Sequence, residues 1–138
     1  FSLAVSDDGS RFLLNPIGMH FSQICARDLL LLDSNNAETM SQPNAPDATA
    51  WAIHGAIHRN NLHARCILHV HSKYATILSC LEDKTMKPID QNTMRFYEKV
   101  SIDYDYDGMG LGDEAERLCT VLGDNSVLLM GNHGVLTA

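Results

Sequence analysis

Apolar residues along this chain come in short runs, and turn-forming Gly, Pro, Asn and Ser residues separate most of them. Runs rich in Val, Ile, Leu and Phe predict strands at residues 11–14, 21–24, 29–32, 66–71, 86–89, 100–104 and 126–130. Apolar positions at helical spacing predict helices at residues 47–59, 73–81, 91–97 and 113–122. Helices that alternate with strands of mixed length predict an α/β fold with helices on both faces of a sheet. The consecutive strands at the start indicate that this sheet is not purely parallel.

Three of these predicted helices begin at polar residues. Asp47 and Ser72 are the expected N-caps of the first two helices, because their side-chain oxygens can accept from free backbone N–H groups. Asp113 and Glu116 have the spacing of a capping box. Residues 103–108 are rich in Asp but lack the closing Glu of a calcium loop, so we expect an acidic strand end and turn there.

Two histidines lie at the end of the apolar run that begins at Cys66. His69 and His71 are two positions apart, so on a strand their side chains point to the same face. His133 follows another apolar run, in a turn flanked by two glycines, where a sheet protein can present a side chain into a cleft. Neutral imidazole suits zinc, and catalytic zinc sites commonly have three protein ligands and one open position. These three histidines are therefore candidate metal ligands.

Other interpretations of the histidines remain open at this point. A His-x-His pair also occurs as a hydrogen-bonded surface pair, and a Gly-Asn-His-Gly turn can simply supply positions with positive φ. His54 and His58 lie four apart on one face of a predicted helix, which could in principle chelate a metal. No carboxylate flanks that pair, so we expect His54 to lie near the site as a supporting residue or to orient the helix.

Composition excludes several classes of partner. The formal net charge of -7 and the absence of a basic stripe argue against nucleic acid. No apolar run reaches membrane-spanning length and no leader is visible, so we expect a cytoplasmic protein without a membrane partner. The four cysteines lack CxxC spacing, which predicts buried free thiols in a reducing compartment. The 138 residues fit one domain.

The motifs together resemble the class II aldolase/adducin family. The resemblance rests on His-Val-His-Ser-Lys-Tyr-Ala-Thr at residues 69–76, Pro-Ile-Asp-Gln at 88–91 and the segment 128–134. It implies a three-layer α/β/α sandwich with a mixed, largely antiparallel central sheet. It further implies that His69, His71 and His133 bind a divalent metal, with zinc expected, and that the protein is a homo-oligomer. Residues 1–138 then form a single domain of this type, without its usual N- and C-terminal extensions.

One segment departs from the family's aldolases. In those enzymes a Ser-Ser-Glu-Trp segment precedes the His-x-His pair; its serines hold substrate phosphate and its glutamate is the acid/base. Aligning Trp51 and His54 with that segment places Ala48 and Thr49 at the serine positions and Ala50 at the glutamate position. Thr49 is therefore the candidate substrate-binding residue, and a methyl group stands where the family has a proton carrier.

Two functions follow from the resemblance. The first is an aldolase-like lyase or related enzyme for a small, sugar-like hydroxy-carbonyl substrate, in which a divalent metal stabilises an enediolate. Its catalytic residue is unassigned, with His54, Tyr74, a metal-bound hydroxide or a residue of a neighbouring subunit as candidates. Loss of the serine pair makes a phosphorylated substrate less suited to the site. The second is a non-catalytic, adducin-like binding or scaffolding domain.

Overall fold

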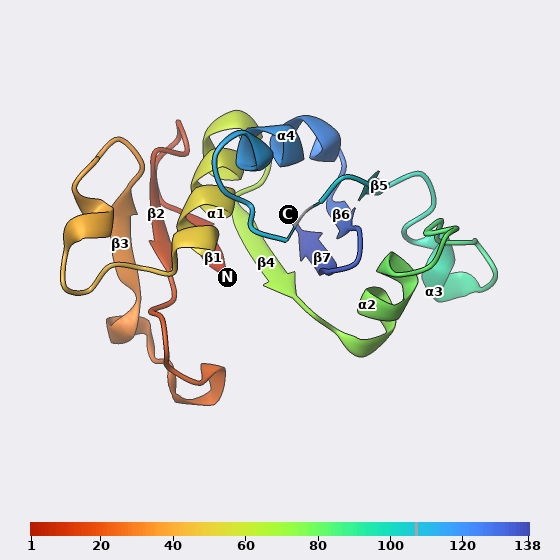
Figure 1. The fold of residues 1–138 in the computed structure, drawn as a ribbon, viewed down its shortest axis with the longest axis horizontal. Helices are drawn as coiled ribbons and strands as arrows, with labels where there is room; N and C mark the ends of the chain where they lie inside the picture. The colour runs from red at the N-terminus through yellow and green to blue at the C-terminus, as the bar shows by residue number, and fades with distance from the viewer. Residues whose placement is uncertain (107) are drawn as a thin grey trace.

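The fold is built on a mixed sheet of order β3-β2-β1-β4-β7-β6-β5, as seen in the computed structural model, which describes residues 1–106 and 108–138 (Figure 1). Its strands are β1 (Ser2–Ala4), β2 (Arg11–Leu14), β3 (Leu30–Asp33), β4 (Cys66–Val70), β5 (Val100–Asp103), β6 (Val127–Met130) and β7 (Gly134–Thr137). Within this sheet β5 and β6 run parallel, and every other neighbouring pair is antiparallel. The predicted mixed, largely antiparallel sheet is confirmed.

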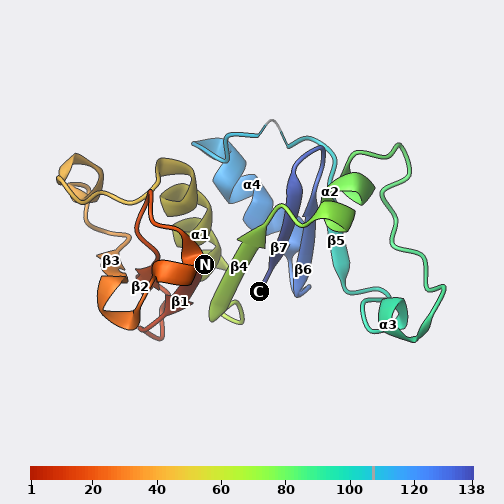
Figure 2. The same ribbon diagram turned by 90° about the horizontal axis from the view of Figure 1, so that it is seen from below.

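Helices lie on both faces of the sheet. They are α1 (Ala48–Asn60), α2 (Lys73–Ser79), α3 (Gln91–Met94) and α4 (Asp113–Leu122), with short 3-10 helices η1 (Phe21–Gln23), η2 (Ala26–Asp28) and η3 (Thr39–Ser41). Helices α1 and α4 pack against each other over one face, whereas α2 packs on β6 and β7. Seen from below, α2 lies in front of the sheet and α1 and α4 lie behind it (Figure 2).

Side-chain alternation explains the two covered faces. Leu128 and Met130 belong to the buried core that α1 and α4 share with the sheet. Leu129, between them, points to the opposite face by the period of a strand and is nevertheless buried. Because α2 contacts β6 and β7, it covers Leu129 from that side. The result is the expected α/β/α sandwich.

Two predicted strands are absent, and a third is less buried than expected. Residues 21–24 begin as the 3-10 helix η1, because the His20 side chain accepts from the Ser22 backbone N–H and turns the chain. Residues 86–89 form no strand; Pro88 has no N–H for a ladder. In β4, Ile67 is buried, but Leu68 and Val70 are 48% and 46% exposed. Their face of β4 is not the one that packs on the α1/α4 core.

The helix starts were predicted with mixed success. Asp47 is the N-cap of α1, where its Oδ1 accepts from the backbone N–H groups of Thr49 at 3.0 Å and Ala50 at 2.9 Å. Ser72 precedes α2, but its side chain makes no capping hydrogen bond. The predicted capping box at Asp113 is wrong, because Gly112 occupies the N-cap position and Asp113 is already helical.

Three further expectations can be compared with the described residues. No helix among residues 1–106 and 108–138 is long and apolar enough to cross a membrane. All four cysteines are free, but Cys119 is buried while Cys25, Cys66 and Cys80 are exposed, so the expectation of buried thiols is correct for Cys119 alone. The acidic segment begins where β5 ends at Asp103, and Asp107 within it lies outside the described residues.

Candidate metal centre

The end of strand β4 carries His69, and His71 is the first residue after the strand. His69 lies opposite Leu136 in the antiparallel pairing of β4 with β7. Its Nδ1 donates to the carbonyl oxygen of Val135 at 3.1 Å. A carbonyl oxygen can only accept, so Nδ1 carries the proton and Nε2 of the neutral ring carries a free electron pair. The strand pairing therefore sets which nitrogen of His69 is available to a ligand.

The turn between β6 and β7 delivers His133. Asn132 has a φ of 56°, the left-handed conformation that Asn tolerates better than most residues. The turn closes with a hydrogen bond from the His133 N–H to the Met130 carbonyl at 3.1 Å, and the Asn132 N–H donates to the Ser79 carbonyl of α2 at 2.9 Å. Helix α2 thus anchors the turn that carries His133.

Gly134 allows the two strand ends to approach. A Cβ atom at this position would lie 2.7 Å from the Val70 carbonyl oxygen and 2.9 Å from Cδ2 of His71. Both distances are too short for a real side chain. Only glycine at position 134 therefore allows His71 to lie beside the turn.

The three imidazoles converge through the same ring atom. The Nε2 atoms lie 3.1 Å apart for His69 and His71, 3.1 Å for His69 and His133, and 2.9 Å for His71 and His133. Tetrahedral zinc, with Zn–N bonds of about 2.0–2.1 Å, holds its nitrogen ligands roughly 3.3 Å apart. The three donor atoms are therefore spaced closely enough to share one metal ion, and in the described residues they form a group of potential ligands within 4.8 Å of one another.

The electrostatics of the cluster favour the neutral form of His69 and His133. Burial, and then the proximity of His133 and His71, lowers the pKa of His69 to about 4. Burial is also the main cause that lowers the pKa of His133, followed by His71. A metal ligand must present an unprotonated nitrogen. His69 and His133 therefore need not lose a proton at neutral pH before they bind a cation.

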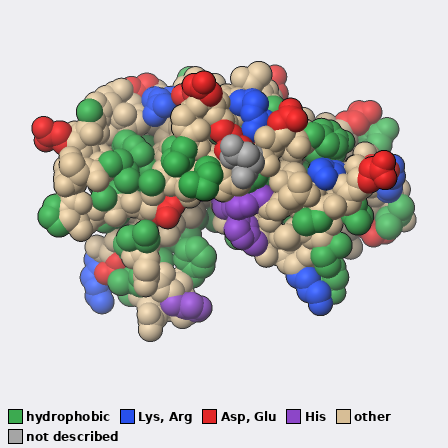
Figure 3. Space-filling model, in the orientation of Figure 1, with side chains coloured by type: hydrophobic (Ala, Val, Ile, Leu, Met, Phe, Trp, Pro, Cys, Tyr) green, Lys and Arg blue, Asp and Glu red, His purple; other side chains and the backbone are tan. Residues whose placement is uncertain are grey.

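The three imidazoles face a cavity of about 290 Å³. Figure 3 shows histidine side chains gathered in a hollow near the middle of the molecule. The first turns of α1 form another wall, with Thr49, Ala50 and His54 at the cavity. Thr49 and Ala50, which align with the family's substrate-binding and acid/base positions, therefore line the same cavity as the histidine cluster. His54 lines this cavity as well.

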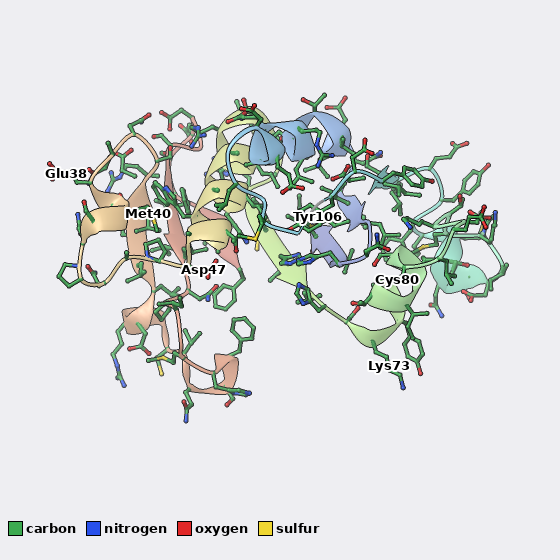
Figure 4. The ribbon with its side chains drawn as sticks, viewed as in Figure 1. Glu38, Met40, Asp47, Lys73, Cys80 and Tyr106 are labelled. Atoms are coloured by element: carbon green, nitrogen blue, oxygen red, sulfur yellow. The ribbon has the colours of Figure 1, made fainter. Side chains whose placement is uncertain are left out.

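Tyr74 is not brought to this cavity. Its side chain is 80% exposed and lies in another surface depression, with Ala75 and Leu78 of α2. In its own chain Tyr74 therefore lies outside the cavity of the histidine cluster, because the first turn of α2 points it outward. Lys73, beside it in the sequence, likewise projects away from the body of the protein (Figure 4).

Tyr106 and Asp47 are among the cavity residues that were not expected from the sequence. Tyr106 is buried, and its ring centroid lies 4.6 Å from that of His133. Asp47 lines the cavity as well as capping α1. Figure 4 shows Tyr106 near β6 and β7 and Asp47 at the start of α1. Tyr106 stands in the acidic segment after β5, where the local pattern contains no indication that the chain folds back over His133.

The fold and the histidine cluster together define an α/β/α sandwich protein with a three-imidazole centre suited to a divalent metal. The chain belongs to the class II aldolase and adducin family: the model of the Class II Aldolase and Adducin N-terminal domain matches residues 1–138. Members of this family commonly bind a divalent metal. The resemblance noted in the sequence is confirmed.

The names of individual relatives describe different activities. An aldolase II superfamily protein from Pseudomonas syringae superposes with a TM-score of 0.84 at 30% identity, over 99% of this chain and 55% of that chain. The L-fuculose 1-phosphate aldolase of Glaciozyma antarctica gives a TM-score of 0.72 at 26% identity, over 99% and 52%. Decarboxylase NovR of Streptomyces niveus is 28% identical over 137 residues, 99% of this chain and 50% of that protein.

The family also includes adducins. Beta-adducin of Homo sapiens is 28% identical over 140 residues, which cover 98% of this chain and 19% of that protein. The chain spans about half the length of the first curated relatives that it matches. Family membership therefore establishes the fold, and leaves the choice between a catalytic and a non-catalytic role to the site.

Proposed function

We propose that this protein is a metal-dependent lyase of the class II aldolase type, acting on a small, sugar-like hydroxy-carbonyl compound. The observation that carries the proposal is the convergence of Nε2 of His69, His71 and His133 within 3.1 Å of one another. Zinc is the metal that we expect, because an all-imidazole set with an open fourth position is typical of catalytic zinc sites.

Each part of the cavity has a role in this proposal. When bound, the metal supplies Lewis acidity toward a carbonyl or hydroxyl oxygen of the substrate. His69, His71 and His133 hold it, and the Val135 carbonyl orients the His69 ring. Tyr106 packs against His133 and shields it from water on that side. Ile53 gives the cavity an apolar wall beside the polar centre.

The start of α1 favours an uncharged substrate over a phosphorylated one. A helix N-terminus attracts anions when its N–H groups are free. Here Asp47 Oδ1 accepts from the Thr49 hydroxyl at 2.6 Å and from the N–H groups of Thr49 and Ala50. Hydrogen bonds from the Thr49 hydroxyl and then the Ala50 N–H lower the pKa of Asp47, which keeps it a carboxylate at neutral pH. A negative group therefore already caps the helix N-terminus that could otherwise attract a phosphate, and the Thr49 hydroxyl oxygen is left to accept from a neutral hydroxyl.

We also propose a cytoplasmic homo-oligomer with a small-molecule substrate. The resemblance to the family's aldolases implies a homo-oligomer, in which a neighbouring subunit can complete the acid/base set that Ala50 leaves open. The free thiols at Cys25, Cys66 and Cys80 are exposed, which suits a reducing compartment. Light scattering on the eluting peak of a size-exclusion column measures the number of chains.

A non-catalytic, adducin-like binding domain is the second candidate function. The specific observation in its favour is the methyl group of Ala50 at the cavity, where the aldolases have a carboxylate. Similarity to beta-adducin over 98% of the chain is in accord with it. Retention of all three convergent imidazoles favours the lyase, because a scaffold has no need of an open metal position.

Metal content is the measurement that separates the two candidates. Elemental mass spectrometry is run on the purified protein, on His133→Ala, and on His63→Ala as a control, since His63 is exposed and remote from the cluster. About one metal per chain in the wild type and control, lost in His133→Ala, supports the lyase. Unphosphorylated and phosphorylated hydroxy-carbonyl compounds are then screened for cleavage. No bound metal after incubation with zinc would refute the lyase and favour the binding domain.

A further inference from the structure

Three buried polar side chains form a hydrogen-bonded chain beneath the candidate metal centre. Ser2 on β1 lies between two histidines of α1, with its Oγ 2.6 Å from His54 Nδ1 and 2.7 Å from His58 Nε2. All three residues are almost fully inaccessible to solvent. The other ring nitrogen of His58, Nδ1, lies 2.7 Å from the carbonyl oxygen of Ala64.

The direction of every hydrogen bond in this chain follows from its last member. The Ala64 carbonyl can only accept, so His58 Nδ1 carries a proton and Nε2 of the neutral ring is an acceptor. Ser2 must then donate its single hydroxyl proton to His58 Nε2. With that proton used, Ser2 Oγ can only accept from His54, so His54 Nδ1 carries the proton. His54 is left with an unprotonated Nε2.

The free Nε2 of His54 is accessible from the cavity, because His54 lines the cavity and Nε2 is not among the fully buried polar atoms without a partner. His54 is among the residues that line the cavity of the histidine cluster, and in the described residues its Nε2 has no hydrogen-bond partner. Side chains on a helix lean toward its N-terminus, so the His54 ring leans over the turn that carries Ala50, four residues earlier. The small side chain of Ala50 leaves this path open. The His54 ring therefore lies over the turn of Ala50, the residue that aligns with the family's glutamate.

The surroundings keep both rings of α1 neutral. Burial is the main cause that lowers the pKa of His54 well below its usual value. Burial is also the main cause that lowers the pKa of His58. The neutral state on which the hydrogen-bond directions depend is thus the stable state at neutral pH.

We propose that His54 Nε2 is a fixed hydrogen-bond acceptor in the cavity, which selects substrates that place a hydroxyl donor against it. Ser2 and His58 are positioning residues that hold His54 in this tautomer. The inference rests on the proposed function, because it concerns the substrate of the same cavity. A compound whose hydroxyl is masked leaves the acceptor unpaired, and we expect about 10- to 100-fold weaker binding from the loss of one buried hydrogen bond.

The tautomer is tested without any substrate. Long-range ¹H–¹⁵N spectra of the protein distinguish a protonated from an unprotonated ring nitrogen. We expect His54 Nδ1 to be protonated and Nε2 unprotonated in the wild type. Ser2→Ala removes the acceptor for Nδ1–H, so a protonated Nε2 should appear, whereas Ser2→Thr keeps the hydroxyl and should restore the wild-type pattern. A protonated Nε2 in the wild type, or no change in Ser2→Ala, overturns the proposal.

Selection for a hydroxyl is tested with two small probes. Hydroxyacetone and methoxyacetone differ in whether the hydroxyl can donate, and each is titrated into the protein while the His54 Nε2 resonance is followed. Hydroxyacetone should shift this resonance and bind at least 10-fold more tightly than methoxyacetone. His54→Asn can direct its amide N–H toward Ser2 but is too short to place an acceptor at the position of Nε2, and should bind both probes alike. Equal binding of the probes to the wild type, or no shift at Nε2 with either, overturns the proposal.

Metal content distinguishes failure of this inference from failure of the proposed function. His54 is not in the group of potential ligands formed by His69, His71 and His133. His54→Asn should therefore retain the metal content of the wild type. A wild type without metal would refute the lyase, while the tautomer and the preference between the probes would still decide the role of His54.

Discussion

The Nδ1 of His69 lies 3.1 Å from the carbonyl oxygen of Val135, on the strand paired with its own. This contact makes the orientation of a candidate metal ligand depend on the register of β4 and β7. A change of register by one residue would turn His69 to the opposite face of the sheet. The geometry of the site therefore depends on the pairing of these two strands.

Gly134→Ala should weaken metal binding. The added methyl would lie 2.7 Å from the Val70 carbonyl oxygen and 2.9 Å from His71, so the start of β7 must move away from the end of β4. We expect a loss of zinc affinity of about 10- to 100-fold, as for other changes that displace a ligand through its support. Competition with a chromogenic chelator measures the affinity. Gly18→Ala is the control: it is strained at a φ of 76° in open space and should leave zinc affinity unchanged.

Asp47→Ala should destabilise the protein by about 1 kcal/mol, the usual effect of losing an N-cap side chain. The substitution removes the hydrogen bonds to the N–H groups of Thr49 and Ala50. Asp47→Ser keeps a capping oxygen without the charge and should recover most of this stability, as measured by urea denaturation. Asp47→Ser should also bind inorganic phosphate more tightly than the wild type. Unchanged phosphate binding would mean that Asp47 does not exclude anions from the cavity.

Ala50→Glu should introduce measurable aldol cleavage of a hydroxy-carbonyl substrate. Ala50 lines the cavity and aligns with the family's acid/base, so we expect a carboxyl group there to transfer a proton. Ala50→Gln, similar in size but without an acid, is the matched control and should not show the gain. Equal rates in both variants would show that the carboxyl group is not the missing element of the cavity.

Stability should fall as the solution is acidified below about pH 6.5, the ordinary pKa of histidine. Burial, with a contribution from Arg65, lowers the pKa of His58 despite the opposing hydrogen bond to Ala64. Between the lowered folded value and the ordinary unfolded value, the unfolded chain binds more protons, so the free energy of unfolding rises with pH in that window.

Denaturation with urea at pH 7 and pH 5.5 measures this dependence. His58→Asn keeps a donor toward Ala64 but cannot titrate, and should show a smaller loss between the two values. His54, whose pKa burial also lowers, should account for part of the remaining loss. A wild type that is equally stable at both values would contradict the buried, neutral state of these rings.

Thiol reagents should distinguish Cys119 from the other cysteines. Cys119 is buried in the core, and burial raises its pKa to about 11, which leaves almost no thiolate at neutral pH. Cys25, Cys66 and Cys80 are exposed. In the native protein these three should react with Ellman's reagent within minutes, and Cys119 after unfolding. If Cys119→Ala lacks the thiol that reacts only after unfolding, Cys119 is identified as the protected thiol.

Features that depend on neighbouring residues could be predicted from the sequence. Asp47 begins α1 because its carboxylate reaches N–H groups two and three residues away. His69 and His71 share a face because a strand alternates its side chains. The strand predicted at residues 86–89 was wrong because its formation depends on distant residues. An apolar run becomes a strand only when a partner strand is available, and the local pattern does not show whether one is.

The sequence by itself determined the α/β class, the family and the identity of the three candidate ligands, because these follow from local periodicity and short motifs. The tertiary structure decided that their Nε2 atoms meet within 3.1 Å, that Tyr106 packs on His133, and that Ser2 joins His54 to His58. Ser2 and His54 are 52 positions apart, and His69 and His133 are 64 apart. The order and register of strands bring such distant residues together, and these arise from the packing of the whole sheet against α1, α2 and α4.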